Sequence, residues 1–399
     1  MTDVRPVRPS GVNGIMRPSN VREANAVAIL KLLLLHGALP RAEISRMLGL
    51  TQGTVTRIVA EFADQGLVQE REPVNGTSRG RPRVPIDLVP DSRLTIGVHI
   101  GVRIVHAALV NLRGEAVLTG RAAHDGSVAG IISDAARLIR DLRQASPTLP
   151  LGVGVIIGGW VEPGEGRVRR HQLLNWRDVD LARLLTAETE MDILVESSVR
   201  AHALADLIFG DAKGHSSFAH VFVGHVVEAS LVFDSRMHAG PEGIGGSLEN
   251  WTMDDGHGRS AQAWEVIGDS ALIAKAQAAN VIDSDGTFED LVETAKSDDP
   301  IGLRALQILN HRAFQVGTLI AAVTDLLGLS LFILSSGVIA EEGAIDYVRQ
   351  GLEAARPGLP APELRAEINS PETLTRAASS VVLASTVLNV RDLWADPIS

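Results

Sequence analysis

Hydrogen-bonding side chains gather between residues 51 and 57, where a segment with helical periodicity begins. They are Thr51, Gln52, Thr54, Thr56 and Arg57. Hydroxyl, amide and guanidinium groups bond to base edges and phosphates, and a helix that enters the major groove presents them from its first turns. We therefore expect these five residues to contact double-stranded DNA.

A set of regularly spaced cations follows. Arg79, Arg81 and Arg83 alternate with Gly80 and Pro82, which makes a thin, extended segment. The negative potential of a narrow minor groove attracts arginines inserted in this way. The alternative is a solvated linker, but the position directly behind a DNA-reading helix favours a wing that contacts DNA.

Three short helices and a hairpin must position these side chains. The expected elements are helices at about 20–36, 40–49 and 51–65, and strands at 67–71 and 84–88. Gly37 and Gly49 end the first two helices, and Thr51 caps the third. This order predicts a winged helix-turn-helix domain over residues 19–89, preceded over residues 1–18 by a disordered arm rich in proline and glycine.

Charge divides the chain in the same place. Residues 1–90 contain 12 Lys and Arg against 8 Asp and Glu, whereas the rest contains 25 against 40. Because an acidic body is repelled by phosphates, we expect the first domain to bind the nucleic acid and the body to have another role.

Composition also limits the cellular setting. The chain has no cysteine, which excludes disulfides and thiolate metal sites. Its first residues lack the apolar core of a secretory signal, and the apolar run at residues 26–35 is too short to span a bilayer. We expect a cytoplasmic protein that does not bind membranes.

The body, residues 90–399, alternates strands and helices. A βββαβαβα order over residues 94–200 begins again at Ser217 and includes a buried strand at residues 331–335. The repeat predicts an α/β fold of two related lobes that face a cleft.

Five segments carry a family resemblance. In order they read IGVHIGVRIVHAALVNLRGEAV, LGVGVIIGGWVEPGEGRV, LLNWRDVDLARLL, ILVESSVRAHALADLIFG and LFILSSGVIA. The body resembles the ROK family, which groups sugar kinases with sugar-responsive repressors, and the domain before it resembles the repressor branch. The resemblance implies a two-lobed, actin-like ATPase fold related to hexokinase. Lobe one is expected at about 90–200 with a terminal helix at 373–394, and lobe two at about 201–370.

Two departures from the family pattern concern catalysis. The family's kinases have an Asp-Ile-Gly-Gly-Thr-like phosphate loop where this chain has residues 99–103, HIGVR. The valine side chain would block the close approach of a phosphate to the backbone. The kinases' Asn-Asp pair, whose Asp is the catalytic base, is matched by Ser197 and Ser198, and a serine cannot take that proton. We therefore expect no enzymatic activity and no cofactor.

A third departure concerns metal. The resemblance implies a structural zinc held by one histidine and three cysteines, but residues 243–246, with Gly256, Gly258 and Ala263, fall at the matching positions. The chain is thus expected to bind no metal.

The remaining polar residues near the expected cleft suggest a ligand. They are Asn175, Trp176, Glu196, Ser197, Ser198, Arg200 and Glu265. One hypothesis is a DNA-binding regulator, favoured as a repressor, that responds to a sugar-like small molecule held by these residues. The alternative is a regulator whose body has lost ligand binding and serves oligomerisation or partner contact, and a residual sugar kinase is the least favoured.

We also expect a homodimer or a higher homo-oligomer, because one helix-turn-helix covers few base pairs. The helices at about 301–327 and 373–394 are possible dimer elements. The alternative is that both are internal core helices. This alternative is favoured for the terminal helix.

Overall fold

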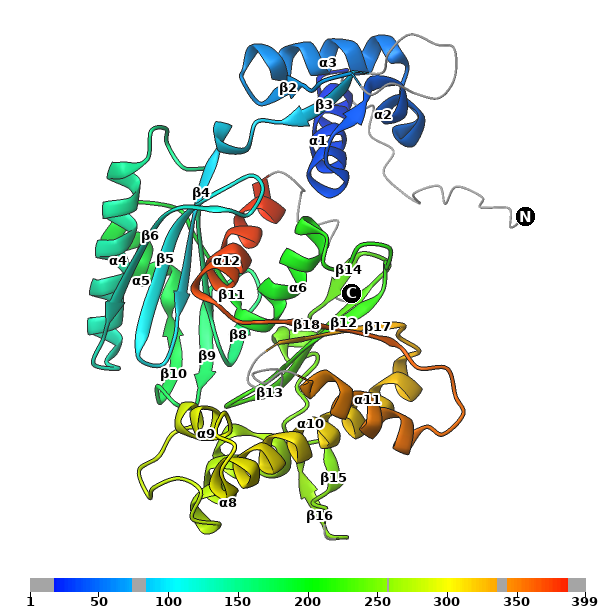
Figure 1. Ribbon diagram of the computed structural model, residues 1–399. Coiled ribbons are helices and arrows are strands. Elements are labelled where there is room, and N and C mark those ends of the chain that lie inside the picture. Colours follow the sequence, from blue (N-terminus) through cyan, green and yellow to red (C-terminus); the bar gives the residue numbers. More distant parts are fainter. Residues whose placement is uncertain (1–17, 74–83, 257, 336–342, 387–399) are drawn as a thin grey trace. The chain divides into compact units, whose positions relative to one another are not determined.

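A computed structural model describes residues 18–73, 84–256, 258–335 and 343–386 of the protein (Figure 1). Residues 1–17 of the arm expected over residues 1–18, the Asn75-Gly76 turn and the arginines Arg79, Arg81 and Arg83 lie outside these ranges, and Pro18 begins the first helix. The chain forms two compact units: the first ends at Asp87, and the second begins at Leu88 and also includes Leu34–His36. Among the described residues, no helix combines the length and apolar character needed to cross a membrane.

The first unit is a three-helix domain with a small sheet, which confirms the predicted winged helix-turn-helix. Its elements are α1 (Pro18–His36), β1 (Leu39–Pro40), α2 (Arg41–Leu48), α3 (Gln52–Asp64), β2 (Val68–Glu70) and β3 (Pro85–Leu88). The sheet order is β1-β3-β2. Ile29, Ile44 and Ile58, one from each helix, are fully buried and build the core.

Local chemistry sets the turn between α2 and α3. Gly49 adopts the left-handed conformation that ends α2, with φ 64°. Thr51 then caps α3, because its hydroxyl accepts a hydrogen bond of 3.2 Å from the Thr54 amide. Val55 and Val59 are buried at helical spacing. The sequence predicted this segment correctly because these signals lie within a few residues of one another.

The second unit contains two five-stranded sheets. The first has the order β11-β7-β4-β5-β6 and is followed in the chain by α6. The strands of this sheet and the helices of the same lobe are β4 (Leu94–Ile100), β5 (Ile104–Asn111), β6 (Ala116–Ala123), α4 (Val128–Ala145), β7 (Val153–Ile157), α5 (Leu181–Thr189), β11 (Ile193–Ser197) and α6 (Ser198–Phe209). Strand β4 pairs antiparallel with β5 and parallel with β7. The two related sheets confirm the predicted two-lobed α/β fold.

The second sheet has the order β14-β13-β12-β17-β18 and packs on α10 and α11. The elements of this lobe are β12 (Phe218–Val223), β13 (Val227–Phe233), β14 (Arg236–His238), α7 (Ala263–Ile267), α8 (Asp269–Ala278), α9 (Phe288–Thr294), α10 (Pro300–Leu327), β17 (Leu331–Ser335), α11 (Ala344–Ala355) and β18 (Glu363–Glu367). Side chains of α10 such as Val316 and Ile320 are buried in the core of this lobe. Helix α10 is therefore an internal core helix of this lobe, which was one of the two roles considered for the helix expected at about 301–327.

The last described helix, α12 (Pro371–Thr386), returns to the first sheet, as favoured from the sequence (Figure 1). Two glycines make room for it. A Cβ atom built on Gly97 or Gly154 would lie 2.1 Å or 2.0 Å from a backbone carbonyl oxygen of Thr375 or Ala378. No side chain tolerates such a distance. The first sheet can therefore pack against α12 only with glycine at positions 97 and 154.

Short polar strands were missed from the sequence. They are β8 (Trp160–Glu162), β9 (Arg167–His171) and β10 (Trp176–Asp180) in one small sheet, β15 (Thr252–Asp254) and β16 (Ser260–Gln262) in a hairpin, and β18 at the edge of the second five-stranded sheet. The helix expected from Val179 begins at Leu181, because Val179 pairs with Val168 across this sheet. Arginine-rich strands such as β9 lack the apolar alternation that would have revealed them.

Candidate functional site

The exposed face of α3 carries the predicted DNA-reading side chains. Gln52, Thr56 and Arg57 are exposed, whereas the apolar residues on the opposite face of the helix are buried. The hydroxyls of Thr51 and Thr54 lie 2.9 Å apart and bond to each other. Thr51 and Thr54 therefore shape the start of the helix, and Gln52, Thr56 and Arg57 are exposed on its surface.

An ion pair fixes α3 against α1. Arg22 and Glu61 approach to 2.6 Å between Nη2 and Oε2. The Arg22 hydrogen bond lowers the pKa of Glu61. Both side chains are solvent-accessible, so the pair contributes little to the stability of the domain.

The second unit contains a pocket of about 450 Å³ that residues from both of its lobes line. The segment after β4 contributes His99, Gly101 and Val102, and the start of α6 contributes Ser198 and His202. From the second lobe come residues of the β12–β13 hairpin and the segment that follows β14. These include Phe222, His225, Glu228, Glu249, Asn250 and Trp264.

Two carboxylates lie on one wall of this pocket. Glu228 and Glu249 both line the pocket, and the two carboxylates are close enough for the charge of Glu249 to act on Glu228. Burial and the nearby Glu249 carboxylate raise the pKa of Glu228 to about 7. Burial also raises the pKa of Glu249. These carboxylates disfavour a phosphorylated ligand, because an ionised carboxylate repels the negative charge of a phosphate group.

Imidazoles form much of the remaining lining. Burial lowers the pKa of His99 to about 3 and that of His171 to about 4, so both rings are neutral at pH 7. Within the described chain, His99 Nδ1 and Ser198 Oγ are buried without a hydrogen-bond partner, and both residues line the pocket. Buried polar atoms are rarely left unpaired, so a ligand with hydroxyl or amine groups would satisfy them.

Of the seven residues predicted for ligand binding, only Ser198 lines the pocket. Trp176 is buried in the core of the first lobe, and Asn175 lies in an exposed turn with φ 52°. Ser197 caps α6 by accepting the Arg200 amide hydrogen at 3.4 Å. Glu265 is exposed, and its carboxylate accepts a hydrogen bond of 3.0 Å from the Gln262 amide.

The remaining two, Glu196 and Arg200, form a buried ion pair with an oxygen–nitrogen distance of 2.5 Å. The guanidinium group also donates to the carbonyl oxygens of Val161 in β8, at 2.7 Å, and Gly243, at 2.8 Å. Arg200 thus joins the first lobe to a segment of the second. Its geometry indicates a structural role, where sequence reasoning suggested ligand contact.

The residues that the sequence reasoning missed come from separate segments: His171, His202, His225, Glu228 and Glu249. One signal was present. Glu228 and His220 interrupt two strands that are mainly apolar, and a polar group in such a strand is worth examining because its burial is costly. His99 was noted only as a departure from the kinase phosphate loop.

Comparison with known proteins matches both units. Residues 95–363 match the model of the ROK family, and residues 22–69 match the model "winged helix-turn-helix DNA-binding". A transcriptional regulator of Mycobacterium bovis is 28% identical over 331 residues, which cover 78% of this chain and 74% of that protein. The xylose repressor of Bacillus spizizenii is 23% identical over 329 residues, which cover 80% of this chain and 83% of the repressor.

A solved structure supports the fold. The crystal structure of a ROK family transcriptional regulator, a homolog of the E. coli MLC protein, superposes with a TM-score of 0.71 at 20% identity. The superposition covers 92% of this chain and 99% of that one. The family model alone spans more than half of the sequence. The chain therefore belongs to the ROK family and carries a DNA-binding winged helix-turn-helix domain ahead of its ROK domain.

Proposed function

We propose that the protein is a sequence-specific transcriptional repressor that binds its operator as a homodimer. The observation that carries this proposal is the exposed polar face of α3, with Gln52, Thr56 and Arg57 opposite a buried apolar face. The similarity to proteins named as a repressor and a transcriptional regulator supports it. A dimer would place two such helices on the two halves of a palindromic site.

Substitutions in α3 and in the wing are expected to differ in their effect. Gln52→Ala or Arg57→Ala removes a base contact, which weakens operator binding by about 1–3 kcal/mol and relaxes sequence preference. Arg79→Ala or Arg81→Ala removes a phosphate or groove contact, which weakens binding to all sequences and lowers its salt dependence.

Fluorescence anisotropy with operator and scrambled DNA, at several salt concentrations, measures both effects. Arg137→Ala is a matched control, since this exposed arginine lies on α4 in the other unit. Equal affinity of the wild-type protein for operator and scrambled DNA would contradict the proposed sequence specificity.

We further propose that the pocket binds an uncharged, hydroxyl-bearing effector, such as a sugar, and that the protein has no kinase activity. The unpaired His99 Nδ1 and Ser198 Oγ support a ligand with hydroxyl groups. Glu228 and Glu249 outnumber Arg170, the cation among the described lining residues, which disfavours a sugar phosphate or a nucleotide. Ser198 also lacks the basicity that kinase chemistry requires.

Thermal shift against matched sugars and sugar phosphates tests the effector. A true effector at a concentration of 100 Kd should stabilise the second unit by about 2.7 kcal/mol, and its phosphate should have little effect. Ser198→Ala should weaken the shift, and Ser385→Ala, on α12 and outside the pocket lining, should leave it unchanged. If every ligand is silent while operator binding is intact, the alternative is favoured, in which the body serves only oligomerisation or partner contact.

A further inference from the structure

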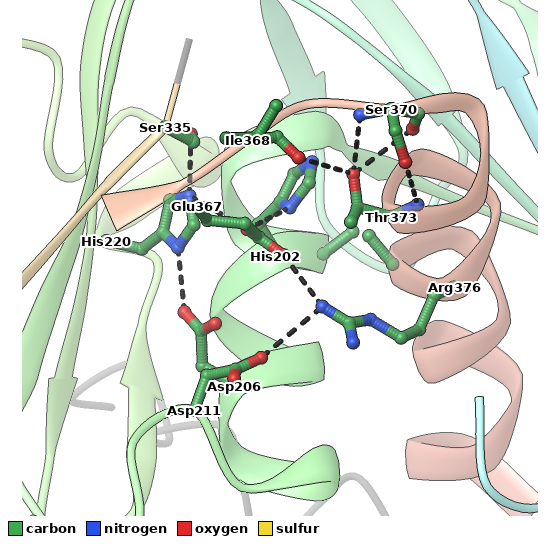
Figure 2. Close-up of polar contacts among 12 residues, drawn as sticks. His202, Asp206, Asp211, His220, Ser335, Glu367, Ile368, Ser370, Thr373 and Arg376 are labelled. Atoms are coloured by element: carbon green, nitrogen blue, oxygen red, sulfur yellow. Dashed lines mark hydrogen bonds and ion pairs between the residues drawn. The ribbon is translucent and has the colours of Figure 1, made fainter. Parts of the chain in front are cut away.

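A group of ionisable side chains converges where α6, β12 and β18 meet (Figure 2). His202 Nδ1 lies 2.9 Å from Glu367 Oε2, and His220 Nε2 lies 3.9 Å from the same oxygen. The two imidazole rings stack with centroids 5.1 Å apart. Nitrogen and oxygen atoms of the three residues all lie within 4.8 Å of one another, although the residues are far apart in the sequence.

This cluster is costly to bury. The side chains of His202 and His220 are 2% and 0% exposed, and that of Glu367 is 10% exposed. Apolar residues of similar volume would generally stabilise such a position as well or better. The fold alone therefore does not account for a carboxylate between two imidazoles.

The charges around the cluster are unequal. Asp206, Asp211 and Glu367 bring three negative charges, and Arg376 brings one positive charge to Asp211 and Glu367, at 3.3 Å and 2.8 Å. With three ionised carboxylates and two neutral imidazoles the group has a net charge of minus two, although burial raises the pKa of Asp206, and Asp206 raises the pKa of His220 against the effect of its own burial. One divalent cation would neutralise it, and so would protons on both imidazoles.

Neighbouring side chains fix the orientation of the three residues. Asp206 Oδ2 lies 2.7 Å from His220 Nδ1, so Nε2, which is hydrogen-bonded to the Ser335 hydroxyl, is the nitrogen of that ring on the side of Glu367. Arg376 binds Glu367 through Oε1 and leaves Oε2 directed at the two histidines. A carboxylate behind a histidine and a fixed ligating carboxylate are typical of metal centres.

We propose that His202, His220 and Glu367 bind a divalent transition-metal ion of the zinc class. Two imidazole nitrogens and one carboxylate oxygen suit zinc, whereas magnesium and calcium take mainly oxygen ligands. The Ser335 hydroxyl, 2.8 Å from His220 Nε2, or a water on the pocket side can complete the coordination. This site is separate from the family's cysteine-bearing zinc loop, whose ligands this chain lacks.

The ion would join the two lobes next to the pocket. His202 lines the pocket, and so does Asn369, which lies two residues beyond Glu367 on the connection from β18 to α12. That connection and residues 210–217, between α6 and β12, are the two links between the sheets. A metal held by α6, β12 and β18 therefore fixes both links relative to each other.

Equilibrium dialysis of the tag-free, full-length protein against zinc tests the site directly. Elemental analysis should find about one tightly bound zinc per chain. Glu367→Gln, which keeps the size of the side chain, should lose it, and Asp206→Asn should weaken binding by about 10- to 100-fold. His215→Ala is the matched control, because this histidine contacts Ser330 and Glu363 outside the cluster.

Two further measurements distinguish the loss of a metal site from the misfolding of a variant. Cobalt bound to the wild-type protein should give visible absorption bands typical of nitrogen coordination, and zinc should displace it. A chelator should lower the unfolding temperature of the wild-type protein but not that of Glu367→Gln. Absence of bound zinc and of cobalt bands in the wild-type protein would overturn the proposal and leave protons as the neutralising charge. Equal zinc affinity in Glu367→Gln would also overturn it.

Discussion

Arg200→Ala is expected to lower the free energy of unfolding of the second unit by about 3–5 kcal/mol, because it leaves the buried Glu196 carboxylate without its counter-ion. The side chains of both residues are less than 5% exposed. The substitution also leaves the carbonyl oxygens of Val161 and Gly243 without the guanidinium donor that joins them. Chemical denaturation of the ligand-free protein, followed by circular dichroism, measures the loss.

Two controls separate this effect from a general cost of losing an arginine. Arg183→Ala removes an exposed arginine of α5 and should change stability by less than about 0.5 kcal/mol. The double variant Glu196→Gln with Arg200→Met removes both charges and should recover part of the loss. A loss below about 1 kcal/mol for Arg200→Ala would show that the ion pair is not buried as described.

Glu228→Gln is expected to stabilise the protein at pH 8. The pKa of Glu228 is raised to about 7 from an ordinary value of 4.5, so the native state retains a proton that the unfolded state releases. Because the native state binds more protons between about pH 4.5 and 7, the free energy of unfolding falls as the pH rises through this range. Near pH 8 the penalty approaches its full value, which is at most about 3.4 kcal/mol.

Unfolding temperatures measured from pH 5 to pH 8 test this prediction. The Glu228→Gln protein should gain stability relative to the wild type as the pH rises and should differ least near pH 5. Glu353→Gln, on the exposed surface of α11, is the control and should follow the wild-type curve. A constant difference between Glu228→Gln and wild type across this range would contradict the raised pKa of Glu228.

The accuracy of sequence-based prediction varied with the range of the interactions. The α3 helix was predicted with its cap because Thr51 and the apolar positions up to Phe62 lie within about three helical turns. The strands of both five-stranded sheets that carry apolar runs were also found. Strands β8 to β10 were missed because their polar residues pair with one another at the edge of the core.

The candidate site shows the same contrast. The exposed side chains Gln52, Thr56 and Arg57 could be predicted, since a helical period alone determines which face they occupy. The pocket could not, because His99, Glu228 and Asn369 reach it from segments that only the paired lobes bring together. Glu196 and Arg200 were expected at a ligand and are instead paired with each other across one helical turn.

The sequence by itself determined the winged helix-turn-helix, the two-lobed α/β fold and the substituted phosphate loop, because caps, periodicity and motif residues act over short stretches of chain. Only the tertiary structure decided the lining of the pocket and the meeting of His202, His220 and Glu367. Contacts at these places join residues from separate segments, such as His202 and Glu367, which are 165 positions apart. Local pattern carries no information about such contacts, which form when the two sheets and α12 pack together.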